Sequence, residues 1–249
     1  MKRPVEELEL NNDKGRLRLR VEPMEKRDLS QVLVLERRCF SSPWSGRLFR
    51  EELEHPWAVL ELVRMIEGPT DLWETLRGQD GLFPFESDEG SRPPPLRAER
   101  GRDRAHRAVS AGQRTTQKDN IKTYGNPHAV HYPLVGYMDY WLVHEELHLL
   151  SLAVHPDFRR LGLGVAMVER VLAATRFIAG KRVKLEVRRN NVAAQALYEK
   201  LGFVVQGVRH GYYSDTGEDA LVMVCEVKAA GDGGGPDRAP SADAEATGD

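Results

Sequence analysis

Two arginines and two glycines follow an apolar run in the middle of the chain, in the pattern Arg159-x-x-Gly162-x-Gly164. The apolar run, residues 147–154, reads as a strand, and a helical pattern begins after the loop. Glycine lets the backbone approach a ligand closely, and the first turn of a helix offers N–H groups and a positive dipole end. Residues 159–165 therefore predict an anion site that suits a pyrophosphate. A tight strand–helix turn with two solvated arginines explains the same residues.

Regular patterns on both sides of this loop predict the elements that position it. Apolar residues alternate or run together in segments that read as strands: 15–21, 57–63, 134–143, 147–154, 182–188, 203–208 and 220–227. Helical spacing follows Asp28, Ser45, Gly164 and Asn191, and Asp28 and Ser45 are residue types that cap helices. This order predicts an α/β fold, with a mixed sheet of about seven strands and helices on both faces.

Residues 66–131 lack periodicity and interrupt the pattern. Their first part is acidic, and their second part, residues 92–122, is basic. Such a stretch cannot bury enough apolar surface to offset the entropy of ordering. We therefore expect a solvated insertion, with a few turns near Leu72-Trp73 or Leu82–Phe85 docked on the body. A substrate or RNA tether made from the basic half explains the same composition.

The rest of the chain fits a single domain, residues 15–228, around this insertion. Without the insertion its core has about 150 residues, the size of one ordinary domain. Residues 1–14 are charged and expected to be flexible. Residues 229–249 are rich in Gly, Ala and Asp and are expected to form a disordered tail.

Composition predicts a soluble cytoplasmic protein. The formal net charge of −2 gives no global attraction to nucleic acid or membrane. Cys39 and Cys225 fit free thiols better than a disulfide framework. The N-terminus has no apolar signal-peptide region, and no apolar run approaches the ~20 residues that span a bilayer. We expect no metal, because His144, His148 and His155 do not have the spacing of a metal motif.

Three groups of residues resemble signatures of the GNAT superfamily of N-acetyltransferases. The pattern from Arg159 to Gly164 is similar to the superfamily's acetyl-coenzyme A loop. A second group resembles its next signature: Asn191, Ala194, Leu197-Tyr198 and Leu201-Gly202-Phe203. A third group is similar to the RimI type: Pro43-Trp44-Ser45, Leu185-Glu186-Val187-Arg188, Tyr212-Tyr213, Glu218-Asp219-Ala220 and Met223. The resemblance covers nearly all of the core, and the insertion departs from it.

This resemblance implies a GNAT acyltransferase fold and a peptide α-N-acetyltransferase. The implied reaction moves an acetyl group from acetyl-coenzyme A to a protein N-terminal alanine, on the eighteenth small-subunit ribosomal protein. Within the same class, acetylation of lysines, other N-termini or small amines is an alternative. A non-catalytic acetyl-coenzyme A sensor and an RNA- or ribosome-binding protein are alternatives from other classes.

The resemblance also assigns the coenzyme site. Loop amides would hold the pyrophosphate, and the preceding strand would pair with the pantetheine arm, since a strand with unpaired N–H and C=O groups can bond the arm's amides. The predicted set is Leu152, Ala153, Val154, Arg159, Arg160, Leu161, Gly162, Leu163, Gly164, Val165 and Asn191. Asn191 fits a helix N-cap as well.

Two side chains are candidates for the chemistry. Acetyl transfer needs a neutral amine, and a free α-amino group has a pKa near 7.7–8.0, so a modest base suffices. The resemblance places this base, acting directly or through water, at Glu186, which alternation puts on one face of its strand with Lys184 and Arg188. Tyr198, seven residues after Asn191 on the same helical face, would protonate the departing thiolate. A carboxylate paired with a neighbouring cation, and a tyrosine at the core rim, explain the same positions.

Aromatic residues are candidates for the acceptor site. Trp44, Tyr212 and Tyr213 are expected to line it. Ordinary aromatic packing explains all three as well.

Overall fold

The computed structural model describes residues 3–77, 132–177 and 182–227. These residues form one mixed sheet of eight strands in the order β1-β2-β3-β4-β5-β6-β8-β7. The strands are β1 (Glu6–Asn12), β2 (Gly15–Pro23), β3 (Ala58–Glu67), β4 (Leu134–Val143), β5 (Glu146–Val154), β6 (Arg182–Arg188), β7 (Val204–Tyr213) and β8 (Glu218–Glu226). The α-helices are α1 (Leu29–Cys39), α2 (Gly46–Glu52), α3 (Thr70–Arg77), α4 (Leu163–Ala174) and α5 (Val192–Lys200).

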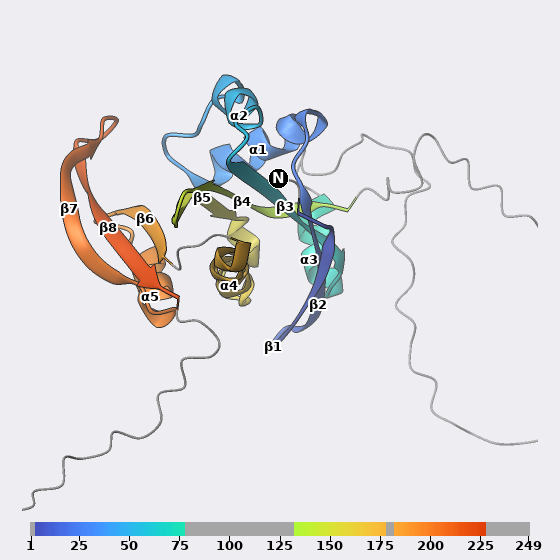
Figure 1. Ribbon diagram of the computed structural model, residues 1–249. Helices are drawn as coiled ribbons and strands as arrows, with labels where there is room; N and C mark the ends of the chain where they lie inside the picture. Colours follow the sequence, from blue (N-terminus) through green and yellow to red (C-terminus); the bar gives the residue numbers. More distant parts are fainter. Residues whose placement is uncertain (1–2, 78–131, 178–181, 228–249) are drawn as a thin grey trace, which may run out of the picture.

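Helices cover both faces of this sheet, so the predicted α/β architecture is confirmed. In Figure 1, α1 and α2 lie over one side of β3, β4 and β5, and α4 lies under the other. We call these sides the α1 face and the α4 face. Tyr137 of β4 points to α1, because its hydroxyl donates to Glu36. Tyr140 points to the opposite side, where its hydroxyl donates to Glu61, the carboxylate that also binds Arg170 of α4.

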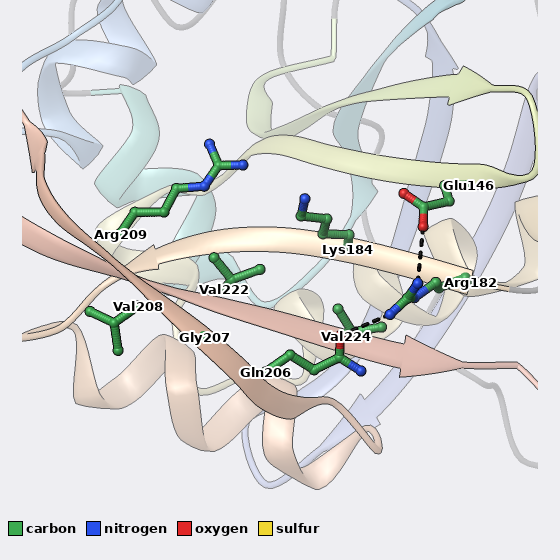
Figure 2. A pocket seen from close by; sticks show the side chains of 9 residues that line it. All are labelled: Glu146, Arg182, Lys184, Gln206, Gly207, Val208, Arg209, Val222 and Val224. Carbon is green, nitrogen blue, oxygen red and sulfur yellow. Dashed lines mark hydrogen bonds and ion pairs between the residues drawn. The ribbon is translucent and has the colours of Figure 1, made fainter.

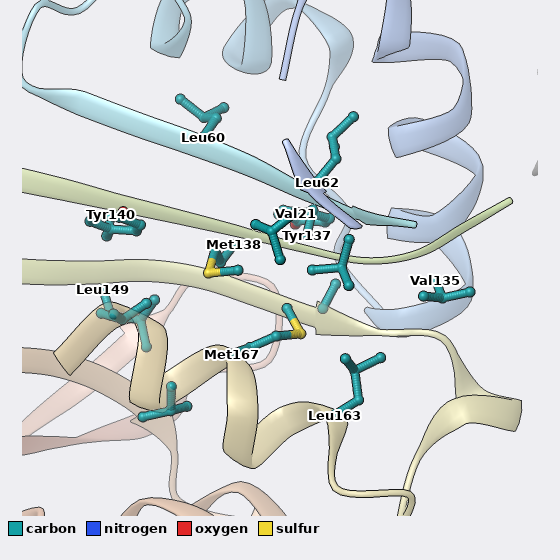
Figure 3. Packing of buried hydrophobic residues seen from close by; sticks show 14 of the residues in the cluster. Val21, Leu60, Leu62, Val135, Tyr137, Met138, Tyr140, Leu149, Leu163 and Met167 are labelled. Carbon is teal, nitrogen blue, oxygen red and sulfur yellow. The ribbon is translucent and has the colours of Figure 1, made fainter. Parts of the chain in front are cut away.

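The core lies on both sides of the central strands (Figure 3). Met138 of β4 and Met167 of α4 are fully buried in the layer on the α4 face. A Cβ at Gly136 would lie 2.9 Å from the Ala153 carbonyl oxygen and 3.2 Å from the sulfur of Met167. The glycine therefore lets α4 pack directly on β4 and β5 near the start of the helix.

The N-terminus forms a strand, so the prediction that residues 1–14 are flexible is wrong for β1. This strand pairs antiparallel with β2, and Leu10 lies opposite the buried Leu17. Alternating Glu and Leu gives β1 one apolar face, and that face packs on the core. The many charges obscure this alternation in the sequence. Residues 1 and 2 lie outside the described part of the chain.

The predicted insertion begins with ordered structure. β3 continues to Glu67, and α3 follows it with Leu72 and Leu76 buried. The predicted docking of turns near Leu72-Trp73 is therefore confirmed. Residues outside the described part include the rest of the insertion (78–131), its basic segment (92–122), the Leu82–Phe85 turn and the tail (229–249).

Of the predicted helix caps, Ser45 and Asp28 have different outcomes. Ser45 caps α2, because its hydroxyl oxygen accepts a hydrogen bond from the Leu48 backbone N–H at 3.3 Å. Asp28 was expected to cap α1, and this is wrong. Its carboxylate accepts instead from the Glu25 backbone N–H at 2.9 Å and from Arg64 at 2.8 Å. The chain enters α1 through a 3₁₀ turn, Lys26–Asp28.

One buried acid has no hydrogen-bond partner among the described residues. Asp139 of β4 is fully buried, and neither of its carboxylate oxygens is bonded. Burial and the nearby Glu52 carboxylate raise the pKa of Asp139 well above its usual range. Asp139 therefore keeps its proton in the folded protein at a pH where the unfolded chain has lost it.

Replacing Asp139 by Asn should flatten the pH dependence of stability. The folded pKa lies above the ordinary value of 3.8. The stability of the wild-type protein is therefore fully present below about pH 4 and falls as the pH rises toward the native pKa, by at most about 1.4 kcal/mol per unit. Asn does not titrate, so the stability of the variant relative to the wild type should increase as the pH rises from about 4 toward the native pKa of Asp139.

Urea unfolding at several pH values measures this difference. The exposed Asp71 provides the control variant Asp71→Asn. A difference between Asp139→Asn and the wild type that stays constant with pH would contradict the raised pKa.

Candidate active site

The site forms where two neighbouring strands separate. β5 and β6 run parallel, and their pairing stops at Leu149↔Leu185. β5 continues to Val154 and β6 to Arg188, so the two strands part toward their C-terminal ends. Leu150 is an extra residue in the register between β5 and β4. Such bulges bend a strand and are frequent next to active sites.

The loop after β5 enters α4 through two residues with left-handed backbone. Arg160 has a φ of 65°, and Gly162 has a φ of 87°. The Ala166 backbone N–H donates to the Gly162 carbonyl oxygen at 3.1 Å as α4 begins. The amides of residues 163–165 precede this bond and lie at the positive end of the helix dipole. The structure therefore has a helix N-terminus where the sequence predicts an anion site.

A groove of about 690 Å³ opens between this loop, the end of β5 and α5. Its lining includes nine of the eleven predicted coenzyme residues: Leu152, Ala153, Val154, Arg159, Arg160, Gly162, Gly164, Val165 and Asn191. The remaining two, Leu161 and Leu163, have buried side chains. Sequence reasoning missed the opposite walls, which are Cys39 and Phe40 at the end of α1 and Ala193, Ala194, Ala196, Leu197 and Lys200 on α5.

The end of α1 is attached to the rim of this groove. The Cys39 thiol donates to the Val154 carbonyl oxygen at 3.4 Å, and Arg159 Nε donates to the same oxygen at 3.2 Å. Burial raises the pKa of Cys39 to about 11, so this side chain is a thiol at neutral pH. The carbonyl of Val154 therefore already has two donors, and no sequence motif indicated either bond.

The start of α5 is fixed to the end of β6. Asn191 caps α5, because its side chain accepts from the Ala194 N–H at 3.2 Å. Gln195 donates from its side-chain amide to the Arg188 carbonyl oxygen at 3.0 Å. A Cβ at Gly164 would lie 3.3 Å from Leu197, so this glycine allows α4 and α5 to approach closely.

Glu186 lies on the α1 face of β6 and is the first residue after the last pair with β5. Its carboxylate pairs with Arg209 of β7 at 3.3 Å, and its side chain is 18% exposed. The Arg209 guanidinium lies 5.4 Å from the ring of Tyr212. The alternation predicted for β6 is confirmed, and the paired carboxylate expected as an alternative is present.

Tyr213 interacts electrostatically with this carboxylate, and Tyr198 interacts in turn with Tyr213. The Tyr198 side chain is buried and does not line the groove. Burial raises the pKa of Tyr198 to about 12, with a smaller contribution from Tyr213. Burial also raises the pKa of Tyr213 to about 12, and Glu186 adds to that shift. The Arg188 guanidinium lies 3.9 Å from the centre of the Tyr213 ring. The fold thus gathers a carboxylate from β6 and hydroxyl groups from α5 and β7.

Trp44 is held by a buried acid. Its backbone N–H donates to Glu36 at 2.9 Å, and the same carboxylate accepts from the Tyr137 hydroxyl. Burial raises the pKa of Glu36. The indole packs on Phe49 with ring centres 5.5 Å apart. Trp44 does not line the groove, so its contact with an acceptor stays a prediction.

A second, smaller hollow of about 280 Å³ lies over β6, β8 and β7 (Figure 2), and its lining includes Arg209, the ion-pair partner of Glu186. Three cations line it, Arg182, Lys184 and Arg209. Arg182 is bonded to Glu146 at 3.2 Å and to Gln206 at 2.8 Å. Its lining also includes Gly207, Val208, Val222 and Val224.

Residues 3–77, 132–177 and 182–227 contain no group of three or more His, Cys, Asp or Glu side chains placed to hold a metal. Within the same ranges, no helix has the length and apolar character needed to span a membrane.

Comparison with known proteins finds similarity to acetyltransferases. The profile of the Acetyltransferase (GNAT) family matches residues 97–203. The [Ribosomal protein bS18]-alanine N-acetyltransferase of Escherichia coli (strain K12) is 40% identical over 88 residues, which cover 34% of this chain and 60% of that protein. The N-alpha-acetyltransferase of Sulfurisphaera tokodaii is 43% identical over 77 residues, covering 30% of this chain and 46% of that protein. The chain therefore spans about 60% or less of these two relatives.

A solved structure extends the similarity to the whole fold. The crystal structure of the ribosomal-protein-S18-alanine N-acetyltransferase from Escherichia coli superposes with a TM-score of 0.53 at 22% identity. The superposition covers 86% of this chain and 97% of that one. At this identity the comparison shows a shared fold.

Proposed function

Because the chain contains a domain of the GNAT acetyltransferase family, we propose that it transfers an acetyl group from acetyl-coenzyme A to the N-terminal alanine of ribosomal protein bS18. The observation that carries this proposal is the parting of β5 and β6. The groove opens beside β5, and Glu186 is the first residue of β6 beyond its last pair with β5. A thioester held along β5 would therefore face an amine held at Glu186. A cytoplasmic location is part of the same proposal.

The groove has the chemistry that coenzyme A needs. The amides of residues 163–165 and the positive end of α4 suit a pyrophosphate. Arg159, Arg160 and Lys200 line the groove and add positive charge. The part of β5 beyond Leu149 offers backbone groups to the amides of the pantetheine arm.

Replacing Gly162 by Asp should weaken binding of acetyl-coenzyme A by at least about tenfold. The position has a φ of 87°, which side chains rarely adopt, and the substitution puts a negative charge beside the proposed pyrophosphate. Isothermal titration calorimetry measures the affinity, and the rise in melting temperature with coenzyme reports binding to the native state. Gly217→Asp is the control, because Gly217 has a φ of 68° and lies in the turn between β7 and β8. Equal affinity in the Gly162 variant and the wild type would rule out this pyrophosphate site.

The side chains near the gap fit acetyl transfer to an amine. The amine nitrogen attacks the thioester carbon, the N–C bond forms and the C–S bond breaks. We assign Glu186 to take the proton from the amine, directly or through water, and Tyr198 to give a proton to the departing thiolate. The raised pKa of Tyr198, about 12, keeps its hydroxyl protonated at neutral pH.

The acceptor assignment rests on the relatives and on the open α1 face. The Escherichia coli relative is named for acetylation of the bS18 alanine. We assign Tyr212, Tyr213 and Trp44 to the acceptor site. Tyr212 is 45% exposed, and its ring meets that of Tyr213 at 5.1 Å.

A second candidate function is acetylation of a broader set of protein N-termini, which the similarity to the archaeal N-alpha-acetyltransferase favours. Incubation with acetyl-coenzyme A and peptides that differ in their N-terminal sequence, read by mass spectrometry, separates the two. Preference for the bS18 N-terminal peptide supports the first proposal. Acetylation of many N-termini at similar rates supports the second, and binding of the coenzyme without acetylation of any peptide would overturn both.

A further inference from the structure

Three aromatic rings, two of them exposed and the third, Trp141, half-buried, meet at the end of the sheet where β4 turns into β5. We call His55, Trp57 and Trp141 the aromatic shelf. The rings of His55 and Trp57 are stacked, with centres 5.1 Å apart and planes at 17°, and the edge of Trp141 meets His55 at 6.3 Å. Trp57 is 43% exposed. An exposed aromatic pair of this kind is typical of a binding surface.

Two bonds to neighbouring elements fix the shelf. The indole N–H of Trp141 donates to the Glu52 carboxylate at the end of α2. The Leu142 backbone N–H donates to the Trp57 carbonyl oxygen at 2.9 Å. The rings are therefore presented in a set arrangement, so a ligand would not have to order them first.

Acidic groups lie behind and beside the shelf. Glu52 is 7% exposed and forms no ion pair with any described residue. Asp139 lies two residues before Trp141 on β4, is fully buried, and interacts electrostatically with Glu52. Glu145 of the β4–β5 turn is exposed and is also without an ion pair in the described part of the chain. Asp139 keeps its proton, so Glu52 is the buried carboxylate behind the shelf that lacks a positive partner among the described residues.

The register of the sheet places the shelf within reach of an acceptor bound at Glu186. Trp141 pairs with His148, and His148 pairs with Lys184, which precedes Glu186 by two residues on the same face of β6. The path crosses from β4 to β5 and from β5 to β6, and then runs two residues along β6 to Glu186. Combining two strand spacings with this step gives a distance of roughly 12 Å between Trp141 and Glu186. An extended chain covers this distance in about three to five residues.

We propose that the aromatic shelf, with Glu52 behind it, binds an arginine or lysine side chain of the acceptor, about three to five residues after the acetylated one. The face of an indole attracts a guanidinium or ammonium group, and the uncompensated carboxylate strengthens that attraction. The inference rests on the proposed function, since it places the acceptor amine at Glu186. It adds a preference for basic sequence that the coenzyme groove does not supply.

Arginine and citrulline peptides test the charge directly, because citrulline has nearly the same shape without the charge. One series begins with alanine and carries a single arginine at positions two to seven among neutral residues, and a matched series carries citrulline. At the best position, kcat/KM should favour arginine by about threefold to thirtyfold, the range expected of a cation on an aromatic face. The preference should appear mainly in KM. Titration with the same peptides, followed by intrinsic tryptophan fluorescence, measures the difference in binding affinity without turnover.

Variants of the shelf test whether these residues cause the preference for arginine over citrulline. Trp57→Ala should bring the arginine-to-citrulline ratio close to one, and Trp57→Phe should keep part of it. Glu52→Gln keeps an acceptor for the Trp141 indole but removes the charge, so it should also lower the ratio. Glu54→Gln is the matched control, because Glu54 lies two residues further on, is exposed and pairs with Lys26. Glu54→Gln should acetylate both the arginine and the citrulline peptide like the wild type.

Two results would overturn the shelf assignment. One is equal kcat/KM and equal fluorescence affinity for arginine and citrulline at every position. The other is a preference that survives unchanged in both Trp57→Ala and Glu52→Gln. If all the peptides were acetylated at one rate, only the assignment of the shelf would be contradicted. If none of them were acetylated, the proposed function would be contradicted as well.

Discussion

Replacing Glu186 by Gln should lower turnover at neutral pH by about 10²–10⁴-fold, the usual contribution of a general base. The amide keeps the shape of the side chain but cannot take the proton. Activity should partly recover at high pH, because an α-amino group with a pKa near 7.7–8.0 becomes neutral without help. Steady-state rates between about pH 6 and 10, together with coenzyme affinity by calorimetry, measure the effect. The affinity should be nearly unchanged.

The ion pair with Arg209 provides the control for this experiment. Arg209→Gln breaks the same 3.3 Å contact but leaves the carboxylate in place. Its turnover should fall far less than that of Glu186→Gln, and without the same rescue at high pH. If Glu186→Gln keeps full turnover at neutral pH while chemistry limits the rate, Glu186 is a structural carboxylate and another group is the base.

Replacing Tyr198 by Phe should also lower turnover by about 10²–10⁴-fold, with a different pH profile. The ring still packs on Phe203, whose centre is 5.6 Å away, so folding should be preserved. The hydroxyl that protonates the thiolate is lost, and a higher pH cannot replace it. No rescue by high pH is therefore expected.

An acetyl donor with a more acidic thiol tests the role of Tyr198 further, since its leaving group needs a proton less. It should restore the rate of Tyr198→Phe more than that of Glu186→Gln. Tyr132→Phe, just before β4, is the control for loss of a tyrosine hydroxyl. Identical pH profiles and donor dependence in Tyr198→Phe and Glu186→Gln would refute the separate roles.

Periodicity and loop chemistry were sufficient to predict most of the fold. The alternation in β6 and the Gly162 turn into α4 are local signals, and both appear where the sequence places them. The groove is lined by residues of β5, of the loop that follows it and by Asn191. These segments are neighbours in the fold because β5 and β6 lie side by side in the sheet. The two errors have different causes: β1 was obscured by its charges, whereas Asp28 binds Arg64 from a distant strand.

What the sequence could not predict are contacts between segments that are far apart in the chain. Arg209 reaches Glu186 from β7, and Cys39 reaches Val154 from α1. Neither pair has a characteristic spacing, because each depends on the position of a strand or helix in three dimensions. The aromatic shelf is a similar case, since Trp57 and Trp141 become neighbours only through the pairing of β3 with β4.

The short pairing between β5 and β6 has a consequence for local stability. The strands β1–β5 and β6–β8 are joined within the sheet by four residue pairs, from Glu146↔Arg182 to Leu149↔Leu185. The amides of β6–β8 should therefore exchange with deuterium through openings that leave β2–β4 protected. A ligand held between the separated ends of β5 and β6 connects the two parts a second time. Acetyl-coenzyme A should slow exchange in β6–β8 more than in β2–β4, and the acceptor peptide should slow it further.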